Sequence, residues 1–155
     1  MIIEFELGVA ERPIEGVLVY RQSEHSFDFE PKPGGGANSI SVADLEIQID
    51  DTTGRALYVW GYHPSVRWER AILRPPAGRP GSLFVRTSEP LVPGKSVRIE
   101  EHRNIATKHD PESGWVCVRL GDFQDEHLIE FAQGVVAGLH GRELSSLWLH
   151  PTTKP

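Results

Sequence analysis

An aromatic and cationic segment near the middle of the chain has the residue types best suited to binding a ligand or a partner. Its members alternate along an expected strand or follow it directly: Tyr58, Trp60, Tyr62, His63, Arg67 and Trp68. Tyrosine and tryptophan offer a large contact area with a polar tip, and arginine offers forked hydrogen bonds. Because Leu57, Val59 and Gly61 make the other face apolar too, the strand is either central and buried or displays an aromatic row.

Displayed aromatic side chains would line a cleft between the sheet and two loops expected at residues 31–41 and 74–81. His63 is the acid–base candidate in such a cleft, since the ordinary pKa of histidine is near neutral. Arg67 would orient a ligand there.

Acidic residues are concentrated in the first third of the chain. Residues 1–51 contain 11 acidic and 3 basic side chains, whereas residues 52–110 contain 5 acidic and 10 basic ones. This asymmetry indicates either mutual neutralisation across one sheet or two surfaces of opposite sign. On the second interpretation, the first third contains the side chains that would steer a cationic partner: Glu24, Asp28, Glu30, Asp50 and Asp51.

Familiar catalytic and metal-binding patterns are absent from the sequence. No two histidines have the i, i+4 spacing that binds zinc on a helix, among His25, His63, His102, His109, His127, His140 and His150. The single cysteine, Cys117, lies between two valines, which is typical of a buried structural thiol. No G-x-S-x-G elbow occurs. We therefore expect no catalytic residues, no metal site and no cofactor, which favours a protein that is not an enzyme.

Length and composition describe an ordinary globular chain. Its 155 residues fit one domain, so we expect residues 1–155 to form a single domain. The net charge of −6 disfavours nucleic acid as a partner, although the cluster of bases at 55–108 softens that exclusion. No apolar run is long enough to cross a membrane, and the acidic first residues do not look like a secretory signal. One cysteine fits a reducing, cytoplasmic location.

Hydrophobic periodicity predicts strands along most of the chain and one helix near its end. Period-two patterns occur at 3–9, 26–30 and 45–49, and the turn at 50–54 makes 42–62 the strongest hairpin signal. From residue 126 to 140, apolar residues recur at helical spacing instead: Leu128, Phe131, Ala132, Val135, Val136 and Leu139.

The expected fold class is α+β, with a mostly antiparallel sheet of about eight or nine strands built from successive hairpins. One amphipathic helix, at about residues 125–140, would pack on this sheet, and a short final strand would follow from Ser145. Residues 152–155 are expected to fray. Gly134 and Gly138 would let the helix approach the sheet or a twin chain closely, so a homodimer is an alternative.

Two functions fit these observations. The first is a non-enzymatic interaction protein, for example an acidic inhibitor that occludes a basic protein partner as immunity proteins do with bacterial toxins. That comparison is one of class and not of sequence. The alternative is a small-molecule-binding domain, or an enzyme of unfamiliar type, with its cleft near residues 58–68.

Overall fold

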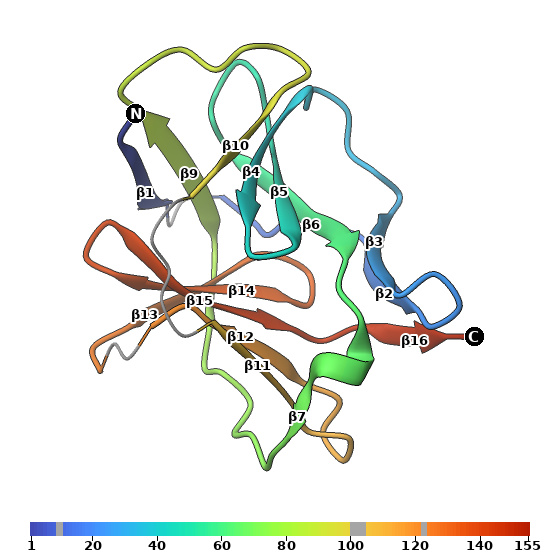
Figure 1. Cartoon of the computed structure of the whole chain (residues 1–155). Helices are drawn as coiled ribbons and strands as arrows, with labels where there is room; N and C mark the ends of the chain where they lie inside the picture. Colours follow the sequence, from blue (N-terminus) through green and yellow to red (C-terminus); the bar gives the residue numbers. More distant parts are fainter. Residues whose placement is uncertain (9–10, 100–104, 122–123) are drawn as a thin grey trace.

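The computed structural model describes residues 1–8, 11–99, 105–121 and 124–155. In these ranges the chain forms two seven-stranded sheets and one two-stranded sheet. The only helical element of this part is the single 3-10 turn η1 (Ser65–Arg67). Figure 1 shows the two large sheets at different levels of the molecule, with the chain crossing between them from β15 (Glu143–Leu149) to β16 (Thr152–Lys154).

Sheet 1 combines strands from the first half of the chain with two later ones. Its order is β10 (Ser96–Arg98), β4 (Asn38–Val42), β5 (Leu45–Ile49), β6 (Ala56–Tyr62), β3 (Ser26–Glu30), β2 (Val17–Arg21) and β16. The hairpin predicted at 42–62 is present as β5 and β6, which pair antiparallel. Leu45, Ile47 and Ile49 point into the core, because side chains alternate between the two faces of a strand.

Sheet 2 is built from the second half of the chain, except for the short strand β7 (Glu69–Arg70). The order of this sheet is β7, β11 (Ala106–His109), β12 (Val116–Arg119), β15, β14 (Val135–His140), β13 (His127–Ala132) and β8 (Arg79–Pro80). The third sheet is the antiparallel pair β1 (Ile3–Gly8) and β9 (Ser82–Thr87). Strand β9 contacts both β6 of sheet 1 and β13 of sheet 2, so the small sheet bridges the two large ones.

The helix predicted at about residues 125–140 is wrong, and with it the α+β fold class. This segment is the antiparallel hairpin β13–β14, whose turn contains Gly134 with a φ of 79°. The apolar residues do not alternate because β14 lies inside sheet 2 and is buried on both faces. A strand that is apolar on both faces can match the spacing of apolar residues along one face of a helix. The glycine in the turn is the local feature that distinguishes a hairpin from a helix here.

The four edge strands of the two large sheets are similar in length and in the direction of their pairing. Strands β10, β16, β7 and β8 are two or three residues long, and each pairs parallel with its neighbour. Residues 152–154 therefore pair with β2 instead of fraying as expected. Very short edge strands offer little backbone for another chain to pair with, which limits aggregation through the sheet edges.

One continuous hydrophobic core joins the three sheets. Phe29 and Ile47 of sheet 1, Val118 and Leu147 of sheet 2, and Leu83 of the small sheet are all fully buried in it. Each buried side chain of this size contributes roughly 1.5–3 kcal/mol, so the core holds the sheets in fixed positions. Among the described residues, no helix has the length and hydropathy needed to cross a membrane.

Candidate functional site

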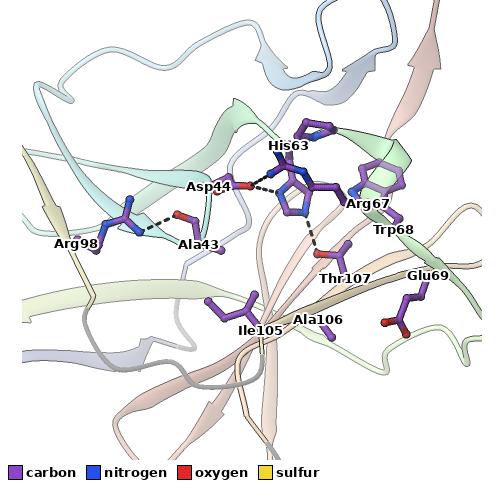
Figure 2. A pocket seen from close by; sticks show the side chains of 11 residues that line it. Ala43, Asp44, His63, Arg67, Trp68, Glu69, Arg98, Ile105, Ala106 and Thr107 are labelled. Carbon is purple, nitrogen blue, oxygen red and sulfur yellow. Dashed lines mark hydrogen bonds and ion pairs between the residues drawn. The ribbon is translucent and has the colours of Figure 1, made fainter.

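A pocket of about 350 Å³ lies where one end of sheet 1 meets the β7–β11 edge of sheet 2 (Figure 2). Sheet 1 provides the β4–β5 turn, the residues after β6, and Arg98 in β10. Sheet 2 provides Glu69 in β7 and Ala106 and Thr107 in β11, with Ile105 just before them. The volume falls within the range of sites for small molecules.

His63 is held firmly at the centre of this junction. Its backbone N–H donates to the His25 carbonyl at 2.7 Å, and its own carbonyl accepts the Tyr20 hydroxyl at 3.0 Å. The imidazole side chain is 8% exposed, with the rings of Phe27 and Trp68 about 6 Å away. The ring position is therefore set by packing and by backbone hydrogen bonds from two other segments.

The two ring nitrogens of His63 face different partners. Nε2 lies 2.9 Å from Oγ1 of Thr107, a buried residue of β11. Nδ1 lies 3.6 Å from Oδ2 of Asp44, in the β4–β5 turn, and makes no hydrogen bond among the described residues. Figure 2 shows the ring between Asp44 and Thr107, so this one side chain connects the two large sheets.

Two arginines stand on either side of the Asp44 carboxylate (Figure 2). Nη1 of Arg67, in η1, is 3.7 Å from Oδ2 of Asp44, and the Arg67 side chain is 69% exposed. Nη1 of Arg98 donates a long 3.5 Å hydrogen bond to the carbonyl of Ala43. Ala43 has a φ of 55°, a conformation that costs a non-glycine residue roughly 1 kcal/mol or more, and it opens the β4–β5 turn that presents Asp44.

Burial lowers the pKa of His63 below its ordinary value of 6.5. The nearby Asp44 carboxylate opposes this shift, and the Arg67 guanidinium reinforces it. Since burial dominates, the imidazole is neutral at pH 7 and one of its nitrogens can accept a proton.

The structure separates the aromatic residues that the sequence grouped together. Tyr58 is 7% exposed and stacks on Phe29 in the core, with ring centroids 5.7 Å apart. Trp60 and Tyr62 are partly exposed, at 38% and 57%, and neither lines the pocket. Trp68 does line it, together with His63 and Arg67.

The walls of the pocket also differ from those expected for the cleft. Residues 31–41 and 74–81 do not line the pocket, whose walls come from the β4–β5 turn and the start of β11 instead.

The five acidic residues that were expected to steer a partner mostly make local contacts within the protein. Asp50 Oδ1 accepts the backbone N–H groups of Thr52 and Thr53, and these hydrogen bonds lower the Asp50 pKa. Asp51 accepts a hydrogen bond from the Ala37 N–H in the same region.

The remaining three acidic residues lie in or beside β3. Asp28 forms an ion pair with Lys32, and Glu30 forms one with Arg21. Glu24 lies in the β2–β3 turn.

Other residues of chemical interest have structural surroundings. Burial raises the pKa of the Cys117 thiol to about 11. No three His, Cys, Asp or Glu side chains of the described ranges come close enough together to hold a metal ion. His102 lies outside the described residues.

Among the pocket residues that sequence reasoning missed, three take part in the contacts described above. Asp44, Arg98 and Thr107 lie far from His63 in sequence, and none belongs to a recognisable motif. Residues 43–44 fall within the hairpin expected at 42–62, so the sequence did not reveal the turn that presents Asp44.

Comparisons with protein-family models, with curated proteins and with solved structures find no match to this chain. What the protein does must therefore be inferred from the pocket itself.

Proposed function

We propose that this protein binds a small organic anion in the pocket between its two large sheets. This proposal rests on Arg67 and Arg98, which both border the pocket. Among the described residues their guanidinium groups make only long contacts, at 3.7 Å to the Asp44 carboxylate and at 3.5 Å to the Ala43 carbonyl. A guanidinium with free donors is well suited to a carboxylate or phosphate group. Trp68, Ile105 and Ala106 offer apolar surface for the rest of the ligand.

The test compares benzoate with benzyl alcohol, which has the same ring and no charge. Titration followed by two-dimensional NMR should show benzoate shifting the Trp68 indole and the Ala106 and Thr107 amide signals. For a ligand of this size we expect a Kd of about 1 mM. Benzyl alcohol should bind at least about fivefold more weakly, since it lacks the charge-assisted hydrogen bonds.

Arg98→Gln supplies the decisive variant, and Arg79→Gln is its matched control. Arg79 is an exposed arginine of β8, at the edge of sheet 2 opposite the pocket. Benzoate binding should weaken at least about fivefold in the first variant and remain unchanged in the second. Equal binding of benzoate and benzyl alcohol, or equal effects of the two substitutions, would refute anion recognition.

The role of an acidic inhibitor of a basic protein stays a prediction. Glu24 lies at the end of β3 opposite Asp50 and Asp51, because β3 runs antiparallel to β6 and the turn at 50–54 precedes β6. The five acids therefore do not form one compact cluster. If a cationic partner is found, its association rate should fall steeply with added salt.

A further inference from the structure

Asp44, His63 and Thr107 form a chain of three polar side chains that ends at the pocket. They come from the β4–β5 turn, the residue directly after β6 and strand β11, so residues distant in sequence converge on one point. His63 Nε2 is within hydrogen-bond distance of Thr107 Oγ1 at 2.9 Å, and His63 Nδ1 faces the Asp44 carboxylate at 3.6 Å. An imidazole between a hydroxyl and a carboxylate is the arrangement that activates a nucleophile.

The carboxylate decides which nitrogen carries the proton. A neutral imidazole has one N–H, and the Asp44 carboxylate can only accept hydrogen bonds. A proton on Nδ1 points at Asp44, whereas a proton on Nε2 would leave the Nδ1 lone pair facing the negative charge. Nδ1–H is therefore the favoured form, and Nε2 accepts the hydrogen bond of the Thr107 hydroxyl. Hydrogen bonds between catalytic groups are often long in the free protein and shorten when substrate binds, and the 3.6 Å between Nδ1 and the Asp44 carboxylate fits that behaviour.

We propose that Thr107 is a nucleophile that His63 activates as general base and Asp44 positions, and that the pocket hydrolyses esters of small acids. Thr107 Oγ1 forms a bond to the ester carbonyl carbon while its proton passes to His63 Nε2. The bond from carbon to the leaving oxygen then breaks, and His63 returns the proton to the leaving alcohol. Water hydrolyses the resulting threonine ester by the same proton transfers, which restores the hydroxyl and releases the acid.

The substrate class rests on the proposed anion-binding function. Arg67 and Arg98 border the same pocket as Thr107, so an ester with a second, anionic group can bind by that group while its carbonyl meets the hydroxyl. The apolar residues Trp68 and Ile105 suit a short hydrocarbon linker between the two groups. The mono-4-nitrophenyl ester of succinic acid has these features, and 4-nitrophenyl acetate is its neutral counterpart.

The experiment measures nitrophenol release and locates the acyl group by peptide mass spectrometry after acid quenching. In the wild-type protein, the succinyl adduct should be found on Thr107, and the succinate ester should turn over at least about tenfold faster than the acetate. Thr107→Ser should keep both adduct and turnover at the same position. Thr107→Val and His63→Gln should abolish the adduct, and Asp44→Asn should lower kcat at least about tenfold.

Thr153→Val is the matched control, because Thr153 is an exposed threonine of β16 that does not line the pocket. Its activity should equal that of wild type. Circular dichroism and thermal unfolding of each variant separate loss of chemistry from loss of fold, and Thr107→Ser keeps the test open if Thr107→Val does not fold. An adduct on His63, turnover by folded Thr107→Val at the wild-type rate, or no adduct in wild type would overturn the proposal.

The two proposals fail in different ways. If benzoate binds but no ester acylates Thr107, the pocket binds anions without being a hydrolase. If Thr107 is acylated equally by both esters and Arg98→Gln changes nothing, the hydrolase stands and anion recognition falls.

Discussion

Replacing Gly138 by alanine would place a methyl group against a partly buried ion pair of sheet 2. In β14, a Cβ on Gly138 would lie 2.1 Å from Glu126 Oε2 and 2.2 Å from Ser146 Oγ, far inside van der Waals contact. Glu126 accepts a hydrogen bond from Ser146 at 2.6 Å and pairs with Arg119, and its side chain is only 11% exposed. The Glu126 carboxylate and the Ser146 hydroxyl must therefore both move, and we expect the hydrogen bond between them to break.

The size of the effect follows from two opposing contributions. Loss of a hydrogen bond to a charged group costs about 1.5–3 kcal/mol. Replacing glycine by alanine inside a strand returns roughly 0.5–1 kcal/mol of backbone entropy. The free energy of unfolding should thus fall by about 0.5–2.5 kcal/mol, which lowers the urea midpoint by about 0.25–1.25 M for an m-value of about 2 kcal/mol/M.

Urea unfolding followed by tryptophan fluorescence provides the assay. Gly34→Ala is the control, because no atom lies within 4 Å of its added Cβ, and its stability should change by less than about 0.5 kcal/mol. In a background with Glu126→Ala and Ser146→Ala, Gly138→Ala should no longer destabilise. An unchanged cost in that background, or no cost in the wild type, would show that the displaced carboxylate is not the cause.

Three further predictions concern titration, thiol reactivity and turn stability. Burial lowers the pKa values of His63 and His109, so the unfolded chain binds more protons below pH 6.5. The free energy of unfolding should therefore fall as the pH drops below that value, and His63→Gln should flatten the slope in urea titrations. Burial raises the pKa of Cys117 to about 11, so a disulfide reagent at about pH 8 should label it slowly in native protein and fast in urea, and fast native labelling would contradict its burial. Asp50→Ala removes acceptors from the 50–54 turn and should cost about 1 kcal/mol, as loss of a helix cap does, whereas an unchanged midpoint would mean that water replaces them.

Strands in which apolar and polar residues alternate could be predicted from the sequence, because one face of such a strand is buried and the other is not. The segment 45–49 shows this: Leu45, Ile47 and Ile49 are buried, and Glu46 and Gln48 are less so. The same rule failed at β14, where interior position in the sheet buries both faces and removes the alternation. The edge strands β7, β8 and β16 could not be predicted from the sequence either, because two or three residues carry no period.

The pocket was predictable only in part for a different reason. His63, Arg67 and Trp68 are close in sequence, so their chemistry could be grouped before the fold was known. Asp44 and Thr107 meet His63 through the pairing of sheets that are distant along the chain, and no spacing in the sequence encodes that meeting. Tyr58 was separated from the others because its ring fits against Phe29 in the core.

The pairing of β16 with β2 also sets an order of events during synthesis. Residues 17–21 can pair with β3 as soon as both have left the ribosome, but the other side of β2 stays uncovered until residues 152–154 have been made. Strand β1 waits in the same way for β9. The growing chain therefore carries open strand edges while residues 31–151 are being made, and pairings so distant in sequence form slowly. Protection of nascent chains from one another should therefore matter for the yield of this protein.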